Sequence, residues 1–326
     1  MKIFKTFALS AALAAAPLFA GAPAQAAYPE QPIRWLVPYP AGGGSDFLAR
    51  TISNSLGPLT GQSIVVENKP GGNTSIAAAE TARSKPDGYT VLSADNGTLV
   101  FNPALYSNLS YNPTTELAPV TLLGRFPMIL VADPKAGLNN VQDVIDRARA
   151  IESGLNFASA GAGSPHHLAM ELFKYELKLD RMTHIPYKGA APSLTDVAGG
   201  QVPVMMVDLA AGAGFIHSGK VKPLAVAHTE RLPQLPDVPT FAELGHPEIV
   251  AAAHVGMVVA AGTPKDTIAA LNEKVVAALN EPKTHATLVE FGVQPVGNTA
   301  DEYAEMLKAE TERWHALIKD IGITLD

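Results

Sequence analysis

Cysteine is absent from the 326-residue sequence, and positively charged residues are few. The missing cysteine excludes a disulfide scaffold, a thiolate metal site, a cysteine nucleophile and a lipid-modified N-terminal cysteine. Twenty-four lysines and arginines stand against 31 aspartates and glutamates, which gives a formal net charge of -7. Nonspecific nucleic-acid binding needs a basic face, so we expect no nucleic-acid partner.

Long apolar stretches are also missing after the N-terminal segment, so we expect no membrane-spanning helix in the rest of the chain. That first segment has a basic head, an apolar run over 7–20 and a small-x-small site at 24–26, which are the three parts of a secretory signal. The apolar run is shorter than the ~20 residues needed to span a bilayer. We therefore expect residues 1–26 to be a signal peptide cleaved after Ala26, and the mature chain to be a soluble periplasmic protein.

The remaining sequence alternates short apolar runs with helical patterns. Strands are predicted at 33–37, 63–67, 89–92, 156–158, 182–185, 204–207 and 224–226. Helices are predicted at 46–56, 75–83, 141–150, 167–177 and 192–197. Strand–helix–strand units at this spacing indicate parallel sheets, and two such blocks indicate two α/β domains. No Ser/Gly-rich linker separates the blocks, so we expect the chain to cross between them on strands.

The sequence pattern from residue 263 onwards predicts helices. Thr263 is predicted as the N-cap of one helix, with Pro264 in its first turn. Thr299 and Glu302 form a capping box that opens a second helix. Apolar residues recur along this second helix at core spacing, and a stripe of this kind usually packs into the core.

Four loops rich in glycine or small polar residues follow predicted strands. They span 38–46, 68–75, 159–167 and 186–191. Ligands of open α/β sheets bind beyond the carboxyl ends of strands, where glycine lets the backbone approach closely and helix N-termini favour negative charge. One such loop could be a plain turn, but four, two in each half, predict a pocket lined from both halves.

The sequence lacks the common motifs of nucleotide-binding sites and of zinc sites. The glycine loops contain neither G-x-G-x-x-G nor Gly-Lys-Ser/Thr, so we expect no nucleotide cofactor. H-E-x-x-H is absent, and His166 and His167 diverge by ~100° on a helix, which leaves His167 with Glu171 as the pair that could share a metal. We expect no metal site.

Individual polar residues leave alternatives open. Ser159 and Ser164 lack the G-x-S-x-G context of an esterase nucleophile, but either one with His167 defines a secreted hydrolase as the rival hypothesis. Asp208 ends an apolar strand and is either a ligand contact or a helix cap. Lys188 either pairs with an anion or lies on the surface.

Seven short motifs occur in an order that resembles the Bug family, the extracytoplasmic solute receptors of tripartite tricarboxylate transporters. These motifs are 38–43 (PYPAGG), 68–71 (NKPG), 86–90 (PDGYT), 102–106 (NPALY), 184–189 (HIPYKG), 199–202 (GGQV) and 261–264 (AGTP). The resemblance implies a type II periplasmic binding protein, with two α/β lobes and a ligand cleft between them. It also implies a first lobe of residues 27–127 plus 249–326, and a second lobe of residues 128–248.

The same resemblance implies a set of ligand-binding residues. In the first lobe these are Tyr39, Ala41, Gly42, Gly43, Ser45, Thr74 and Ser75, and His254 stands near the expected cleft where many members carry Trp. In the second lobe they are Ser159, Ala160, Ser164, His167, Tyr187, Lys188, Gly189 and Asp208. The implied partners are a small carboxylate and the membrane subunits of a tripartite tricarboxylate transporter, with no catalysis and with a monomeric receptor.

Two questions stay open at this point. The same cleft could serve a ligand sensor for a signalling partner instead of a transporter. The aromatic side chains of Tyr39, Phe126 and Tyr187, with His254, suit an aromatic acid, whereas polar donors from both lobes suit a linear dicarboxylate. The acidic net charge does not exclude an anion, because backbone amides and helix ends can supply local positive potential.

Overall fold

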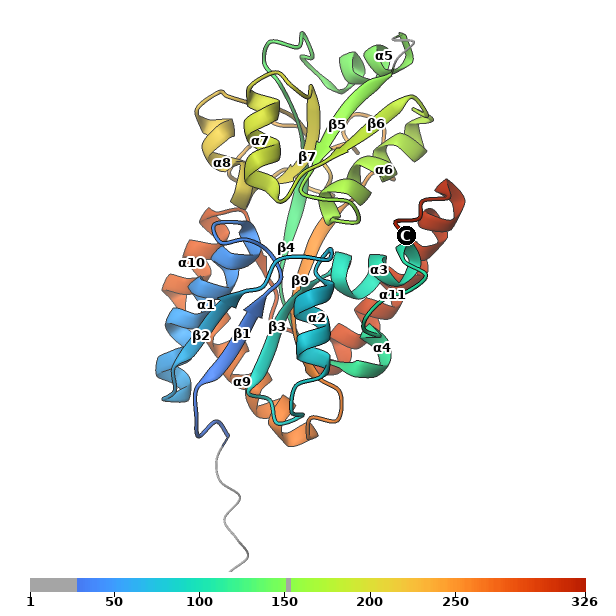
Figure 1. Ribbon diagram of the computed structural model, residues 1–326. Helices are drawn as coiled ribbons and strands as arrows, with labels where there is room; N and C mark the ends of the chain where they lie inside the picture. Colours follow the sequence, from blue (N-terminus) through green and yellow to red (C-terminus); the bar gives the residue numbers. More distant parts are fainter. Residues whose placement is uncertain (1–27, 151–153) are drawn as a thin grey trace, which may run out of the picture.

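The computed structural model describes residues 28–150 and 154–326, so the predicted signal peptide and its cleavage site lie outside the described residues. Within the described residues, ten strands form one continuous sheet in the order β2-β1-β3-β9-β4-β7-β5-β6, with β8 and β10 also paired to β4. Figure 1 shows two lobes, one above the other, with β4 and β9 running between them. The mixed α/β architecture and the two lobes confirm the expected fold class.

The first lobe begins with a parallel block. Its elements are β1 (Ile33–Val37), α1 (Gly44–Thr60), β2 (Ile64–Asn68), α2 (Ser75–Ala82) and β3 (Thr90–Asp95). Strand β1 pairs in parallel with both β2 and β3, as the strand–helix–strand spacing predicts. Helix α1 does not stop at Gly57 and Pro58, because the Thr60 hydroxyl donates to the Leu56 carbonyl at 2.9 Å and Gly61 closes the helix at φ 67°.

The second lobe repeats the pattern. Its elements are α5 (Val141–Ala150), β5 (Leu155–Ser159), α6 (Pro165–Leu177), β6 (Met182–Pro186), α7 (Ala190–Ala198), β7 (Val204–Asp208), α8 (Leu209–His217) and β8 (Lys222–Val226). Strand β5 pairs in parallel with β6 and with β7. Each predicted strand of this block is present, extended by one or two residues at its ends.

Two long antiparallel strands connect the lobes. They are β4 (Leu117–Ala132) and β9 (Ala252–Ala260). Strand β4 pairs with β9 over 117–127 and then with β7 over 128–132, so one strand belongs to both halves of the sheet (Figure 1). The chain therefore crosses between the lobes on a strand, as the absence of a flexible linker suggested.

Short helices and the C-terminal helices complete the first lobe. They are the π-helix η1 (Gly97–Phe101), α3 (Asn102–Leu105), α4 (Pro113–Glu116), α9 (Lys265–Asn280), α10 (Pro282–Glu290) and α11 (Ala300–Ile321), with β10 (Gln294–Pro295) between the last two. The predicted cap at Thr263 is wrong. Residue 264 occupies the N-cap position of α9, and the Thr263 hydroxyl instead donates to the Ala260 carbonyl at 2.7 Å.

The capping box of α11 is confirmed, since Glu302 N–H donates to Thr299 Oγ1 and Thr299 N–H donates back to Glu302 Oε2. The apolar stripe of this helix is core, with Tyr303 and Trp314 almost fully buried. None of the helices within residues 28–150 and 154–326 is long and apolar enough to cross a membrane.

Candidate functional site

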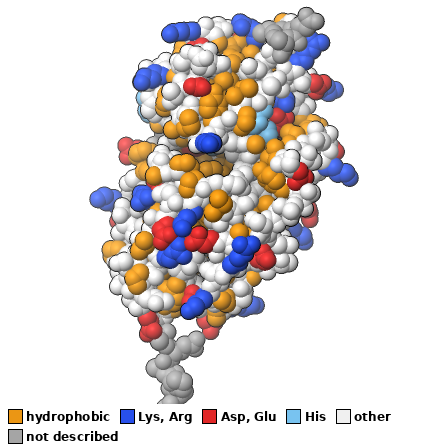
Figure 2. All heavy atoms as spheres, viewed as in Figure 1, with side chains coloured by type: hydrophobic (Ala, Val, Ile, Leu, Met, Phe, Trp, Pro, Cys, Tyr) orange, Lys and Arg blue, Asp and Glu red, His pale blue; other side chains and the backbone are white. Residues whose placement is uncertain are grey.

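A cavity with about 710 Å³ of space, part of it open to solvent, lies where the two lobes meet. Figure 2 shows a hollow at this level, with hydrophobic side chains gathered along it. Its wall is made by the loops after β1, β5 and β6, the last residues of β3 and β7, and side chains of β4 and β9. The cavity therefore lies beyond the carboxyl ends of parallel strands from both lobes, where α/β sheets bind ligands.

Nine of the sixteen residues expected to bind ligand lie on this wall. They are Tyr39, Ala41, Gly42, Gly43, Ser45, Ala160, Lys188, Gly189 and Asp208. The other seven, Thr74, Ser75, Ser159, Ser164, His167, Tyr187 and His254, are not among the wall residues. The wall also contains residues outside the expected set, notably Asp95, Phe126, His166 and Val255. Asp95 ends a buried strand just as Asp208 does, and this position in the sequence could have identified Asp95 as a candidate wall residue.

The loop between β1 and α1 is held in place from below by one carboxylate. Asp46, almost fully buried, accepts hydrogen bonds from the Gly42 N–H at 3.0 Å, from Arg50 Nε at 2.9 Å and from Asn68 Nδ2 at 3.0 Å. Burial alone would raise the pKa of Asp46, but these donors together lower it below its ordinary value. Asn68 Nδ2 also donates to the Tyr39 carbonyl at 3.0 Å. Asn68, the first residue of the loop 68–75, thus holds the loop 38–46 in place.

The Thr74–Ser75 segment supports the wall from behind. Thr74 is buried with φ 73°, and its hydroxyl accepts a hydrogen bond from Thr98 Oγ1 at 2.9 Å. The Thr98 backbone N–H in turn donates to Asp95 Oδ1 at 2.8 Å. The Tyr39 hydroxyl donates to the other oxygen of Asp95 at 2.6 Å, which fixes the phenol ring at the cavity. Burial, with the nearby charge of Asp95, raises the pKa of Tyr39, so the hydroxyl stays a donor.

Four helices begin at the cavity, and they differ in how their N-termini are capped. Ser164 caps α6 by accepting from the His167 N–H, and Asp208 caps α8 by accepting from the Ala211 N–H at 2.9 Å. Helices α1 and α7 have glycine at the N-cap, Gly43 and Gly189, with no side-chain cap. Because the first N–H groups of a helix have no partner inside it, α1 and α7 present free donors and positive dipole ends to the cavity.

Asp208 and His166 form a pair on the wall. His166 Nε2 lies 3.0 Å from Asp208 Oδ2, and both residues are buried. Burial would raise the pKa of Asp208, but the hydrogen bond and charge of His166, together with the Ala211 N–H, hold it below the ordinary value. Asp208 is therefore the cap of α8, as one of the two alternatives predicts, and it also lies on the cavity wall, where contact with a ligand stays a prediction.

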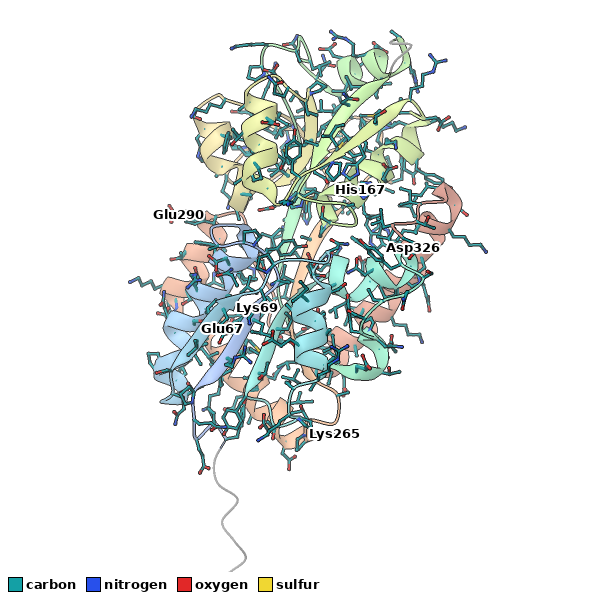
Figure 3. All side chains as sticks on the ribbon, in the orientation of Figure 1. Glu67, Lys69, His167, Lys265, Glu290 and Asp326 are labelled. Atoms are coloured by element: carbon teal, nitrogen blue, oxygen red, sulfur yellow. The ribbon has the colours of Figure 1, made fainter. Side chains whose placement is uncertain are left out.

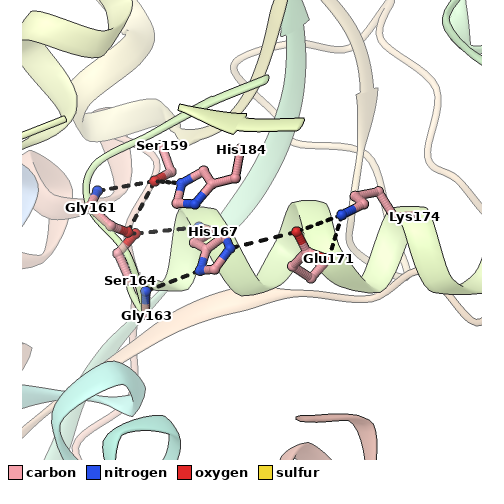
Figure 4. Close-up of polar contacts among 8 residues, drawn as sticks. All are labelled: Ser159, Gly161, Gly163, Ser164, His167, Glu171, Lys174 and His184. Atoms are coloured by element: carbon pink, nitrogen blue, oxygen red, sulfur yellow. Dashed lines mark hydrogen bonds and ion pairs between the residues drawn. The ribbon is translucent and has the colours of Figure 1, made fainter. Parts of the chain in front are cut away.

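His167 lies behind the wall, at the lower edge of the second lobe (Figure 3). Its Nδ1 accepts from the Gly163 N–H at 3.0 Å, and its Nε2 lies 3.6 Å from Glu171 Oε1. The ring stacks on His184 with centroids 3.8 Å apart. Figure 4 shows that both ring nitrogens of His167 are directed to these two partners.

The serines needed for a hydrolase are engaged elsewhere. Ser159 Oγ lies 2.6 Å from His184 Nε2, and Ser164 Oγ donates to the Gly161 carbonyl at 2.7 Å (Figure 4). Ser159 and Ser164 are both essentially inaccessible to solvent. The pairing of either serine with the His167 ring is therefore not formed, and the hydrolase alternative is wrong on geometry because a nucleophile must reach both base and substrate.

Two more expected residues point away from the cavity. On β9, Ala253 and Val255 face the cavity, so the alternation of a strand turns His254 to the opposite side, where its Nδ1 lies 3.4 Å from Glu310 Oε2. The Tyr187 hydroxyl donates to Asp196 Oδ2 at 2.7 Å and ties the loop after β6 to helix α7.

Lys188 is the cation of the wall. Its side chain is exposed, and it takes part in none of the ion pairs found among residues 28–150 and 154–326. In the first lobe, Lys69 is paired with Glu80 and Arg34 with Glu67, and none of these four residues lies on the cavity wall. In the same described part of the chain, no three His, Cys, Asp or Glu side chains cluster as metal ligands.

Comparison with known proteins places this geometry in a family. The family model described as "Tripartite tricarboxylate transporter family receptor" matches residues 48–323. The protein BugT of Bordetella pertussis is 32% identical over 299 residues, which cover 91% of each chain. Among solved structures, the periplasmic binding protein BugD superposes with a TM-score of 0.84 at 33% identity, covering 91% of this chain and 99% of that one.

A second solved structure, Rpa4515 of R. palustris with adipate, has a TM-score of 0.87 at 33% identity over 91% of this chain and 99% of its own. These likenesses agree with the resemblance seen in the motifs and with the two-lobed fold of a periplasmic binding protein. The chain therefore belongs to the receptor family of tripartite tricarboxylate transporters, whose members are periplasmic solute-binding receptors and not enzymes.

Proposed function

We propose that this chain captures a small carboxylate in the cavity between its lobes and delivers it to the membrane subunits of a tripartite tricarboxylate transporter. The observation that carries the proposal is the pair of uncapped helix N-termini, α1 from the first lobe and α7 from the second, which open onto one cavity. A carboxylate there can accept hydrogen bonds from both lobes, with Lys188 adding positive charge. The adipate bound by Rpa4515 supports this class of ligand.

We assign ligand contact to the wall residues and a supporting role to the others. The proposed contacts are Tyr39, Ala41, Gly42, Gly43, Ser45, Ala160, Lys188, Gly189 and Asp208, to which we add Phe126 and His166. Thr74, Ser159, Ser164, His167 and Tyr187 would act by holding the wall loops in place, as their hydrogen bonds to neighbouring groups suggest.

Binding would be coupled to closure of the lobes. We propose lobe boundaries at 127/128 and 248/249, close to where β4 changes partners and where Met128 N–H donates to the Ala251 carbonyl at 3.0 Å. Bending at these two crossings would move one lobe against the other as a hinge. Ligand that contacts both lobes stabilises the closed arrangement, which the membrane subunits can then recognise.

The cellular setting of the proposal follows from the N-terminal sequence. Residues 1–26 would direct export and be removed after Ala26, and the receptor would work as a monomer in the periplasm. Sequencing the N-terminus of protein isolated from the periplasm tests the cleavage site, and light scattering tests the monomer.

Calorimetry on protein purified from the periplasm tests the ligand class. We expect binding of at least one acid from a panel of mono-, di- and tricarboxylates, and a matching rise in melting temperature. Binding only of an amine or of a neutral sugar would overturn the proposal. Delivery is tested by uptake of a bound acid into cells that contain or lack the membrane subunits, with loss of uptake expected when either they or the receptor are deleted.

A further inference from the structure

The charges on the cavity wall are unevenly arranged. Both oxygens of Asp95 accept hydrogen bonds within the protein, one from the Tyr39 hydroxyl and the other from the Thr98 backbone N–H. Asp208 remains close to the free space, partnered by His166 and by its own helix. Lys188, in contrast, comes from the loop that leads into the uncapped helix α7. One side of the cavity thus favours an anion, and another already contains a carboxylate.

Gly44 shows where the carboxylate of Asp208 lies. A Cβ atom built on Gly44, the first residue of α1, would lie 3.2 Å from Asp208 Oδ1 and 3.3 Å from Phe126 Cε1. Asp208 of the second lobe, the ring of Phe126 and the start of α1 therefore meet at one place. On the side of the α1 start that faces Phe126, a carboxylate of the protein therefore already lies where a ligand anion could bind, whereas the Gly42 and Gly43 side of the same loop stays open.

Most of the remaining wall is apolar. Phe126, Ala160, Pro165, Pro192, Ala253 and Val255 contribute hydrocarbon surface from both lobes. Apart from Lys188 and the pairable His166, no cationic side chain lines the cavity within the described residues. A ligand with an apolar body would bury that body against these residues, whereas a charged group placed among them would lose its hydration without gaining a partner.

We propose that the cavity selects acids with a single carboxylate on an apolar body, and that Asp208 is the residue that excludes a second charge. This inference rests on the proposed function and narrows it. The ligand carboxylate would lie between the glycine loop before α1 and the start of α7, near Lys188, and the apolar body would extend towards Phe126. A second carboxylate at the Phe126 end would face Asp208 among apolar side chains, where like charges repel.

Matched pairs of acids test the proposal by calorimetry at pH 7.5. Hexanoate and adipate share a six-carbon chain, and benzoate and terephthalate share a ring, so each pair differs by one carboxylate. We expect the monocarboxylate of at least one pair to bind at least tenfold more tightly than its partner. We also expect Asp208→Asn to reduce this ratio to below about threefold by improving dicarboxylate binding. Asn keeps the cap of α8, because Asn is as good an N-cap as Asp.

Two further variants keep the test decisive. Asp133→Asn removes another buried carboxylate, one that accepts from the Lys135 N–H at 2.9 Å away from the cavity wall, and should leave the ratio unchanged. Asp208→Ser also removes the charge and keeps a capping oxygen, and it replaces Asp208→Asn if that variant has a lowered melting temperature.

The outcomes separate this inference from the proposed function. Equal or tighter binding of both dicarboxylates by the unchanged protein overturns the inference and leaves carboxylate capture standing. A preference for monocarboxylates that persists in both Asp208 variants overturns the role of Asp208. Failure to bind any of the four acids, and malate and citrate as well, defeats the proposed function itself.

Discussion

The carboxylate of Asp46 accepts the backbone N–H of Gly42 at 3.0 Å, so a buried charge of helix α1 holds the loop that lines the cavity. Replacing Asp46 with Ala removes this anchor and its bonds to Arg50 and Asn68. Because a hydrogen bond to a charged group contributes about 1.5–3 kcal/mol, we expect carboxylate affinity to fall about tenfold or more in calorimetry.

A matched acid serves as the control for Asp46→Ala. Asp143, in the first turn of α5, accepts the Asn139 N–H at 2.6 Å in the same kind of contact, but away from the cavity wall. Asp143→Ala should leave affinity unchanged. Equal losses in the two variants would show that Asp46 has no special role at the site.

Two adjacent glycines are predicted to respond differently to a methyl group. A Cβ on Gly44 would crowd Asp208 and Phe126 across the cavity, whereas a Cβ on Gly43 has Pro40 O, at 3.8 Å, as its nearest neighbour. We expect Gly44→Ala to hinder approach of the lobes and weaken binding about tenfold, with a smaller effect of Gly43→Ala. Calorimetry measures affinity, and small-angle scattering with and without ligand measures closure. A larger loss in Gly43→Ala would contradict the proposed contact between lobes.

Lys188 should supply the salt-sensitive part of the binding energy. Its ammonium forms no ion pair within residues 28–150 and 154–326 and is exposed at the wall, so its attraction for a carboxylate is worth about 1 kcal/mol and is screened by salt. We expect Lys188→Ala to weaken binding about fivefold in low salt and less in 0.5 M salt. Lys85→Ala, which removes an exposed lysine outside the wall, is the control and should change neither value. An unchanged affinity in Lys188→Ala would place the ligand carboxylate elsewhere.

His184 is predicted to make the fold sensitive to acid. Burial, helped by the nearby charges of His167 and Lys174, lowers the pKa of His184 to about 3, against 6.5 for a free side chain. Between pH 6.5 and 3 the unfolded chain therefore binds a proton that the folded chain does not, so stability falls as pH falls. The slope for one such proton approaches about 1.4 kcal/mol per pH unit.

Urea unfolding between pH 7 and pH 4 measures this slope. His184→Gln cannot take up the proton and should lose stability less steeply than the unchanged protein. His217→Gln removes an exposed histidine at the end of α8 and should leave the slope as it is. The same slope in all three proteins would rule out His184 as the source.

Gly256 on β9 is predicted to be essential for packing of the first lobe. A Cβ there would overlap the ring and hydroxyl of Tyr303, which is fully buried on α11. We expect Gly256→Ala to lower the free energy of unfolding by roughly 2–4 kcal/mol because the core must shift. Gly214→Ala, at an open position inside α8, should be neutral or stabilising by up to about 1 kcal/mol. Urea unfolding measures the free energy of unfolding of both variants. A Gly256→Ala protein as stable as the unchanged protein would contradict the close packing of Tyr303 against Gly256.

Local sequence was enough to predict most elements of the fold and the wall loops. The parallel strands, their helices and the Thr299 capping box depend on side-chain periodicity and on caps within a few residues. Strands β4 and β9 were harder to predict. In β4, Pro119, Gly124 and Pro127 interrupt the apolar pattern, and the strand is stable because partners distant in sequence pair with it on both sides.

The division of the site into wall and support shows what sequence and tertiary structure each decided. The sequence determined that loops with glycine and small polar residues would follow strands of both lobes, because backbone freedom and helix starts are local properties. Only the tertiary structure decided which side chains face the cavity. Strand alternation turned His254 away, and a helix start presented His166 while directing His167 to Glu171. The directions of these side chains depend on how the two lobes pack. That packing is set by residues far apart in the chain, so local sequence patterns do not reveal it.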